Sequence, residues 1–130
     1  MSRENIKLLI VEDDEIIRRV LDNFAVRKGW EVNLAEDGRA AINAYEKEEY
    51  NVIIMDCQMP VLDGYETTGE IRQLESRRSK HTPIIALTAD ASEGSRETCL
   101  NAGMDDYLTK PIEVNAFYDI VDKWTKSKGK

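Results

Sequence analysis

The sequence predicts a single α/β domain in which helices cover both faces of a parallel β-sheet. Short apolar runs alternate with amphipathic helical stretches along the chain, and polar residues follow the ends of the apolar runs. Parallel strands need crossover connections, and the helices of those connections pack on the faces of the sheet. A chain of 130 residues, 42% of them hydrophobic, is long enough for one such core and too short for two. We therefore expect one domain over residues 1–130, with its core at about 7–124.

The first half of the chain contains two strand–helix pairs. Lys7–Val11 is a short apolar run that predicts the first strand. After it, apolar residues spaced three and four apart predict one face of a helix, namely Ile16, Ile17, Val20, Leu21, Phe24 and Ala25. Gly29 is expected to end this helix. Glu31–Ala35 alternates as a second strand does, and Ala40–Tyr45 marks the second helix.

The third strand is predicted to be the most deeply buried. Val52–Met55 is apolar without interruption, as expected when both faces of a sheet are covered. The helix after it opens at Asp63 and Gly64, and we interpret Asp63 as its N-terminal cap. The pattern that predicts this helix consists of Tyr65, Thr68, Ile71, Arg72 and Leu74.

Two further strand–helix pairs complete the chain. Ile84–Leu87 predicts the fourth strand, and Glu93–Ala102 predicts a fourth helix that stops at Gly103. Tyr107–Thr109 predicts the fifth strand, and Val114–Trp124 predicts the fifth helix. The result is a doubly wound sheet of five parallel strands.

Polar side chains stand at the ends of four of these strands. Glu12 and Asp13 follow the first strand, Asp56 the third, Thr88 the fourth and Lys110 the fifth. The carboxyl ends of parallel strands lie at one edge of the sheet, where such folds bind their ligands. Carboxylates from two strand ends, a hydroxyl and an ammonium group are thus expected to meet there. This placement makes Asp56 the predicted phosphoryl acceptor.

Composition excludes several classes of function. The net charge of −7 argues against direct nucleic-acid binding, because phosphate backbones select basic surfaces. No apolar stretch approaches the length of a membrane span, and the first residues lack the pattern of a signal peptide. We therefore expect a soluble cytoplasmic domain without membrane contact. Cys57 and Cys99 have no metal-ligand spacing and are expected to be free thiols.

Several motifs, in order along the chain, resemble those of the receiver domains of two-component response regulators. They are Leu9–Asp13, Met55–Gly64, Ala86–Ala89 and Gly103–Pro111, and the resemblance extends over Lys7–Trp124. The second and fourth motifs are similar to those of receivers in hybrid sensor histidine kinases and multistep phosphorelays. The resemblance implies a flavodoxin-like (βα)5 fold with strand order 2-1-3-4-5.

The resemblance assigns Asp56 as the nucleophile that becomes an aspartyl phosphate, a role that carboxylates play in other phosphoryl transfers. It implies Mg²⁺, or Mn²⁺, held by Asp13 and Asp56 directly, by Glu12 through water and by the backbone carbonyl of Gln58. Magnesium prefers such oxygen ligands and keeps several waters. The cation would offset the repulsion between an anionic nucleophile and an anionic donor. Gln58 and Asp90 are implied to flank the path of the attacking water.

The resemblance also implies a switch. Thr88 and Lys110 would bind the remaining phosphoryl oxygens. Tyr107 would swing inward as Thr88 moves, which rearranges the surface formed by the fourth helix, fifth strand and fifth helix. The peptide bond between Lys110 and Pro111 is expected to be cis.

The implied function is a phosphorylation-controlled signalling switch rather than an enzyme acting on other substrates. The phosphoryl donor would be a phosphohistidine on a sensor histidine kinase or a histidine phosphotransfer protein, and slow autodephosphorylation would reset the domain. The partner surface is implied near the first helix, at Ile17, Arg18 and Leu21. The domain is expected to be a monomer or a weak phosphorylation-dependent dimer.

Other interpretations remain open at this point. The chain could be a non-switching protein-binding module, or an aspartate-nucleophile phosphatase. The phosphatase would need a second aspartate two positions after the nucleophile, where Gln58 stands. Asp14 is interpreted as the cap of the first helix. Tyr107 could be a core aromatic instead of a switch residue. His81 is expected to be a solvated surface residue.

Overall fold

The computed structural model describes residues 6–59, 62–78, 80–89 and 92–126, and these form alternating strands and helices. The strands are β1 (Lys7–Val11), β2 (Glu31–Ala35), β3 (Val52–Asp56), β4 (Ile84–Thr88) and β5 (Asp106–Thr109). The helices are α1 (Glu15–Arg27), α2 (Gly38–Lys47), α3 (Gly64–Glu75), α4 (Glu93–Asn101) and α5 (Val114–Lys126). Within the described part of the chain, no helix is both long and apolar enough to span a bilayer.

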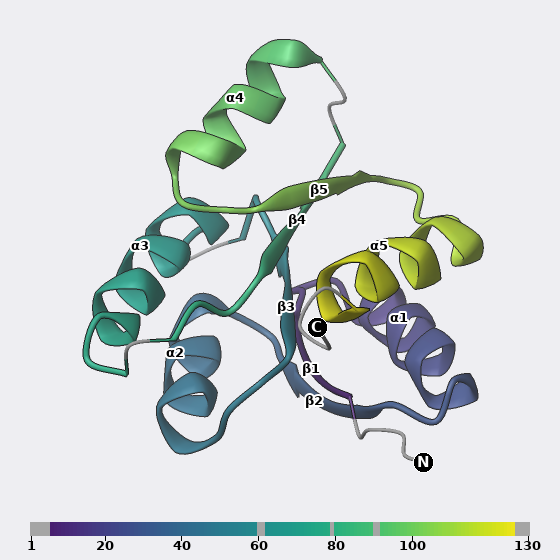
Figure 1. Cartoon of the computed structure of the whole chain (residues 1–130). Helices are drawn as coiled ribbons and strands as arrows, with labels where there is room; N and C mark the ends of the chain where they lie inside the picture. Colours follow the sequence, from purple (N-terminus) through teal and green to yellow (C-terminus); the bar gives the residue numbers. More distant parts are fainter. Residues whose placement is uncertain (1–5, 60–61, 79, 90–91, 127–130) are drawn as a thin grey trace.

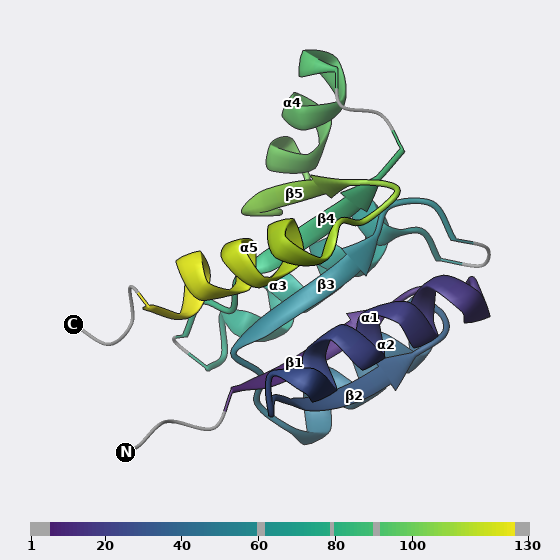
Figure 2. The ribbon, with the colours of Figure 1, turned by 90° about the vertical axis from the view of Figure 1, so that its right-hand side faces the viewer.

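All strand pairs are parallel, and the sheet order is β2-β1-β3-β4-β5. This confirms the predicted fold and places the reversal of strand order between β1 and β3. Helices α1 and α5 cover one face of the sheet, and α2 and α3 cover the other (Figures 1 and 2). Helix α4 follows β4 and stands at the β5 edge of the sheet (Figure 1).

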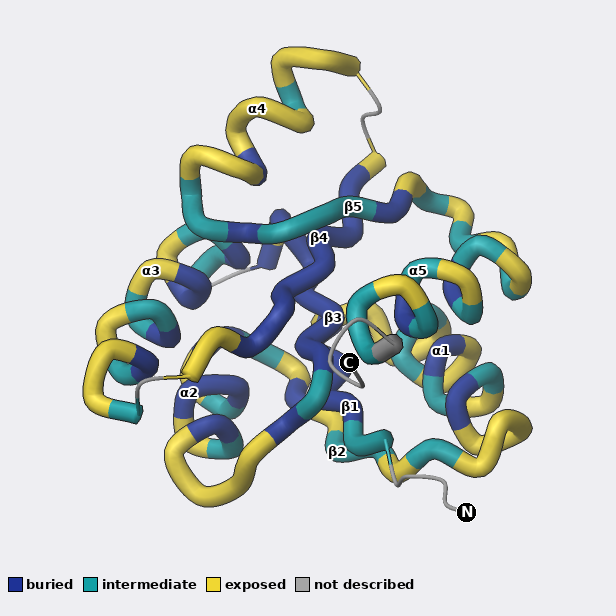
Figure 3. The backbone as a smooth tube through the Cα atoms, in the orientation of Figure 1, coloured by how far each residue is buried: buried dark blue, intermediate teal, exposed yellow. Residues whose placement is uncertain are grey.

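The strand side chains alternate between two separate cores. Leu8 and Ile10 of β1 pack with Phe117 of α5, whereas Leu9 and Val11 pack with the helices of the opposite face. Every residue of β3 and β4 is buried (Figure 3). The unbroken apolar runs in the sequence therefore arise because each of these strands supplies residues to both cores.

Helix α1 departs from the simple expectation that its apolar stripe is buried. Leu21 and Ala25 are fully buried, but Ile16 is 74% and Val20 is 39% exposed. The spacing of the apolar residues correctly predicts that they share one face of α1, but the core covers only part of that face. Leu21 was expected near the partner surface and has no exposed area, so it can contribute to that surface only from beneath.

The predicted helix boundaries are confirmed by their capping contacts. The Asp14 carboxylate accepts hydrogen bonds from the backbone N–H groups of Ile16 and Ile17 at 2.8 and 3.2 Å. Asp63 forms a reciprocal capping box with Glu66 at the start of α3. Gly29 and Gly103 end α1 and α4 at φ values of 80° and 105°, a backbone region that favours glycine.

A clamp of ion pairs joins α3 to the amino end of β5, far from the carboxyl edge of the sheet. The Arg72 guanidinium donates to Glu75 at 2.6 Å, to Asp105 at 2.8 Å and to the carbonyl of Gly103 at 2.9 Å. His81 was expected to be solvated. Its side chain is half exposed, but its Nε2 lies 2.8 Å from Asp105 Oδ1, so His81 is attached to this clamp.

Gly64 allows α3 to begin directly beneath the end of β3. A Cβ at this position would lie 2.2 Å from the carbonyl oxygen of Asp56, a distance at which the backbone must move. Gly69, in the same helix, has nothing within 4 Å of a Cβ. Because Gly64 has no side chain, the start of α3 can pack directly against the backbone of Asp56.

We expect Gly64→Ala to destabilise the fold by about 2–3 kcal/mol, because overpacking against fixed backbone has few ways to relax. Gly69→Ala is the matched control and should stabilise the protein by about 1 kcal/mol through helix propensity. Urea denaturation measures both changes. Equal effects of the two substitutions would contradict the close approach at Gly64.

Candidate functional site

A cleft of about 620 Å³ opens at the carboxyl ends of β1, β3, β4 and β5. Of the predicted site residues that the structure describes, its lining includes all but Tyr107, namely Glu12, Asp13, Asp56, Gln58, Thr88 and Lys110. These residues come from four separate strand ends. The parallel sheet therefore assembles the predicted constellation in one place.

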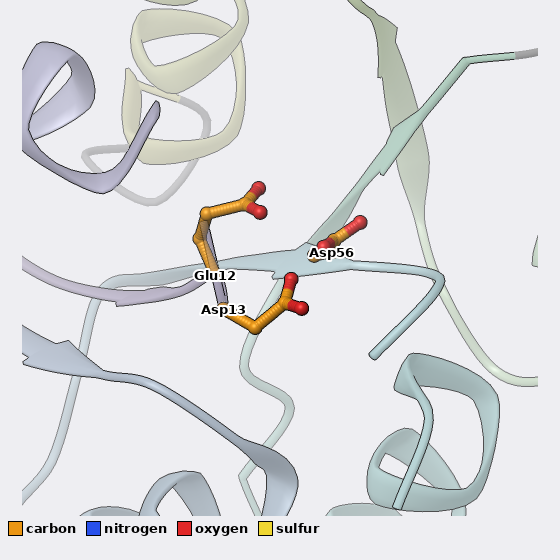
Figure 4. Close-up of side chains that lie close together, drawn as sticks. All are labelled: Glu12, Asp13 and Asp56. Carbon is orange, nitrogen blue, oxygen red and sulfur yellow. The ribbon is translucent and has the colours of Figure 1, made fainter. Parts of the chain in front are cut away.

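Three carboxylates meet within this cleft. Glu12, Asp13 and Asp56 each offer an oxygen atom within 4.8 Å of the others (Figure 4). Glu12 and Asp56 are buried, whereas Asp13 is exposed. The cluster thus has two carboxylates fixed in the sheet edge and one at the mouth of the cleft.

The residues around Glu12 fix its position. Its backbone N–H donates to the carbonyl of Ala35 at 3.0 Å, and its Oε2 accepts from the backbone N–H of Asp14 at 3.1 Å. The Arg18 guanidinium donates to the Glu12 carbonyl at 2.7 Å. Arg18 was expected on the partner surface, and the structure gives it this further, structural role, which no local sequence pattern indicates.

Lys110 is the cation that the described residues place within the carboxylate cluster. Its Nζ lies 3.2 Å from Asp56 Oδ1 and 3.4 Å from Glu12 Oε1. Its backbone N–H donates to the carbonyl of Thr88 at 2.8 Å, which ties the end of β5 to the end of β4. The peptide bond between Lys110 and Pro111 is cis, as the resemblance implied.

The charges of the cluster are not balanced. The pKa of the Glu12 carboxyl is raised to about 7, chiefly by burial and in part by the nearby Asp56, against the lowering effects of the Asp14 backbone N–H and of Lys110. Burial likewise raises the pKa of Asp56, although Glu12 and Lys110 oppose that change. Burial would lower the pKa of Lys110, but the charges of Asp56 and Glu12 outweigh it and raise this pKa. Two buried carboxylates share one ammonium group, so the site can accept additional positive charge.

The donor set fits a hard divalent cation. All three clustered side chains offer carboxylate oxygens, the ligands that magnesium and manganese prefer. Among the described residues, Glu12 Oε1 is a buried oxygen that accepts no hydrogen bond, and its ion pair with the Lys110 ammonium is long, at 3.4 Å. Such an acceptor is better satisfied when a further cation or a water binds it. The residues present therefore suit the magnesium that the resemblance implied.

The sequence did not reveal the contribution of α4 to the cleft. Ser92, Ser95 and Thr98 line its far side, and Thr88 Oγ1 lies 3.4 Å from Ser95 Oγ. Ser92 also caps α4 by accepting from the backbone N–H of Ser95 at 3.3 Å. Serines and threonines in an exposed helix carry no distinctive pattern, so only the fold places them here.

Tyr107 is not among the residues that line the cleft. It lies in β5, is half buried, and packs against the core on the α2 and α3 face. Its position agrees with a core aromatic in this state, and its inward movement remains a prediction.

The first residue after Asp56 is a buried thiol. Burial raises the pKa of Cys57 to about 12, with a smaller opposing effect from Tyr65. Cys57 is therefore a neutral thiol at pH 7 and does not compete with the carboxylates for a cation. Both cysteines are free, as predicted.

Comparisons with known proteins agree with this geometry. Residues 8–122 match the family model described as "Response regulator receiver domain". "Hybrid signal transduction histidine kinase I" of Dictyostelium discoideum is 36% identical over 121 residues, which are 89% of this chain and 7% of that protein. "Sensor protein GacS" of Pseudomonas syringae pv. syringae is 39% identical over 120 residues, 92% of this chain and 13% of that protein.

Two solved structures are similar over nearly their whole length. The receiver domain of the sensor histidine kinase PA1611 from Pseudomonas aeruginosa is 42% identical, with a TM-score of 0.85 and coverage of 95% of this chain and 99% of that chain. It was solved with a magnesium ion coordinated in its active site cleft. The receiver domain of Ssk1, co-crystallised with the histidine phosphotransfer protein Ypd1 of Saccharomyces cerevisiae, is 30% identical with a TM-score of 0.91. That match covers 100% of this chain and 95% of the other.

With its sheet order, its acidic cleft and the matched family model, the chain belongs to the response regulator receiver domains of two-component signal transduction. It spans only 7% and 13% of the length of the two curated kinases to which it was compared.

We expect Asp56→Asn to raise the free energy of unfolding by about 1 kcal/mol at pH 7 without divalent cations, because a raised pKa means that the ionised carboxylate is held at a cost. As the pH falls through the raised pKa of Asp56, the wild type takes up a proton and the difference should shrink. Asp119→Asn, at an exposed position of α5, is the control and should stay within about 0.5 kcal/mol. A destabilised Asp56→Asn protein would contradict the charge imbalance.

Proposed function

We propose that Asp56 accepts a phosphoryl group from a phosphohistidine on a sensor histidine kinase or a histidine phosphotransfer protein. Phosphorylation then changes the surface formed by α4, β5 and α5, and slow hydrolysis restores the starting state. The observation that carries the proposal is the position of Asp56, buried at a strand end with Glu12, Asp13 and Lys110 around it in one cleft. The domain, residues 1–130, catalyses only its own phosphorylation and dephosphorylation.

In the transfer step, a carboxylate oxygen of Asp56 forms a bond to phosphorus as the bond from phosphorus to the histidine nitrogen breaks. Lys110, which already donates to Asp56 Oδ1, binds an oxygen of the arriving phosphoryl group by a charge-assisted bond. Thr88 offers its hydroxyl from the neighbouring strand end. Lys110 neutralises, and Thr88 binds, the negative charge of a phosphoryl group that Asp56 alone would repel.

The carboxylates of Glu12, Asp13 and Asp56, together with the backbone carbonyl of Gln58, would hold Mg²⁺ or Mn²⁺. The cation supplies charge neutralisation between nucleophile and donor. The magnesium ion in the cleft of the PA1611 receiver supports this assignment. Gln58 is exposed, which leaves its side chain at the solvent side of the cleft, where hydrolytic water approaches. Asp90, expected on the same path, lies outside the described residues.

Phosphorylation of Asp56 would draw Thr88 toward the phosphoryl group and away from Ser95. In this structure Thr88 Oγ1 lies 3.4 Å from Ser95 Oγ. Movement of Thr88 frees space toward β5, into which Tyr107 turns. Such a change alters the exposed surface of α4 and β5, which is the output of the switch and the surface for any weak dimer.

An apolar groove beside the cleft supports the proposed donor partner. Its described lining is Ile16, Ile17, Val20, Leu21, Lys110, Pro111 and Ile112. The groove shares Ile17 and Lys110 with the acidic cleft, so a helix seated in it brings a side chain close to Asp56. The exposed Ile16 and Val20 belong to this groove, which accounts for their departure from the core. The Ssk1 receiver bound to a histidine phosphotransfer protein supports a partner of that chemistry.

Incubation with acetyl phosphate and magnesium is expected to add one phosphoryl group, detected by intact mass. Asp56→Asn and chelation of the cation should each abolish the addition. Lys110→Ala should slow it about 100-fold, because a preorganised charged donor is lost. Absence of modification in a folded, cation-binding protein would favour the non-switching binding module instead.

A second expectation concerns the groove. Ile16→Glu and Val20→Glu should slow transfer from a histidine phosphotransfer domain at least about tenfold, since each places a charge in an apolar contact. Val26→Glu is the matched control, because Val26 is 59% exposed on the same helix and outside the groove. Reaction with acetyl phosphate should be unchanged in all three. Equal loss of transfer in the Val26 variant would refute the assignment of the groove.

A further inference from the structure

The thiols of Cys57 and Cys99 are in contact in the reduced protein. Their Sγ atoms lie 3.9 Å apart although 42 positions separate them in the sequence, and each side chain is only 2% exposed. Neither residue is used by the phosphoryl-transfer site as described above. The pair joins the residue after Asp56 to helix α4.

The two cysteines are held very differently. The backbone of Cys57 is fixed on both sides, since its N–H donates to the carbonyl of Leu87 at 3.1 Å and its carbonyl accepts from Gly64 at 3.0 Å. In α4, whose nine residues the structure describes in full, Cys99 alone is buried. This helix is exposed on most of its surface (Figure 3). Cys99 is therefore the residue through which α4 enters the core, where it contacts Cys57.

We propose that Cys57 and Cys99 form an intramolecular disulfide when the protein meets a hydroperoxide, and that this bond ties α4 to β3. The Sγ atoms must approach to about 2.05 Å. Because β3 is fixed, the movement falls on α4, which has few buried contacts to resist it.

The route of the oxidant follows from the cleft. Cys57 is part of the lining of the acidic cleft, and Cys99 is not. Hydrogen peroxide is small enough to enter, and Cys57 is the first of the two thiols that it meets. Because Cys57 is a buried neutral thiol, this first step is slow. The Cys57 sulfur displaces water from the peroxide and becomes a sulfenic acid; the Cys99 thiol then attacks that sulfur, loses its proton, and expels a second water. Two thiols are oxidised and one peroxide is reduced to two waters.

The bond would oppose any rearrangement of α4. The Cys57 sulfur stands one residue from the phosphoryl acceptor, and α4 carries the surface that phosphorylation is proposed to change. This consequence rests on the proposed function, whereas formation of the bond does not. Oxidation would leave Asp56 reactive while disconnecting it from its output surface.

The test incubates the folded full chain with hydrogen peroxide, and a reference sample in the same buffer without peroxide. Both samples are then analysed by intact mass and peptide mapping. The expected result is a loss of two hydrogen atoms per chain, with one peptide pair linked through Cys57 and Cys99, reversed by a thiol reductant. Asp56→Asn should form the same linked peptide pair, so failure of the phosphoryl-transfer proposal would not affect this result.

The single-cysteine variants separate the two steps. Cys99→Ser should accumulate a Cys57 sulfenic acid that dimedone traps, whereas Cys57→Ser should give little adduct at the buried Cys99. Circular dichroism verifies that each variant is folded. Free thiols after treatment, a bond between two chains, or equal trapping at both cysteines would each overturn the proposal.

Hydrogen exchange gives the readout on α4. Amides of Glu93–Asn101 should exchange at least about tenfold more slowly in the oxidised form, because the bond removes openings of a weakly anchored helix. The phosphorylation-induced change in these amides should also disappear. Unchanged exchange in a chain carrying the bond would refute the link between the bond and α4.

Discussion

One ammonium group shared between two buried carboxylates determines the character of the site. Lys110 lies within 3.4 Å of both Asp56 and Glu12, yet burial still raises the pKa of both acids. The fold thus maintains a local excess of negative charge that a proton or a further cation can offset. On the proposed function, the same excess would repel an anionic phosphoryl donor from Asp56 until a cation is bound. The burial of the acids would then make the reaction depend on a metal.

The sheet order makes this arrangement possible. Because the chain reverses direction of winding between β1 and β3, the acidic residues after β1 stand beside the end of β3. The central strand has neighbours on both sides and helices on both faces, so Asp56 cannot move far. Gly64 reinforces this restraint by letting α3 start against the Asp56 carbonyl. On the proposed function, the change on phosphorylation would then fall on the periphery, where α4 and β5 lie.

Sequence patterns predicted the strands and the sheet class because apolar runs and helical spacing can be read along the chain. They predicted the residues of the cleft because polar residues follow the ends of those runs. They could not predict how far the core covers a helix, so Leu21 was placed on the surface and the exposure of Ile16 was not anticipated. Contacts between distant segments were equally hidden. Ser95 beside Thr88, and Cys99 against Cys57, follow from how α4 leans on the sheet, which no periodicity encodes.

The clamp around Arg72 gives α4 a fixed end. Its guanidinium holds the carbonyl of Gly103, immediately beyond the C-terminal end of the helix, and Asp105 at the start of the next strand. The opposite end of α4, at Ser92 and Ser95, lies over the cleft. On the proposed function, a small displacement near Thr88 would turn α4 about this fixed end, and the free end of a longer helix would move further.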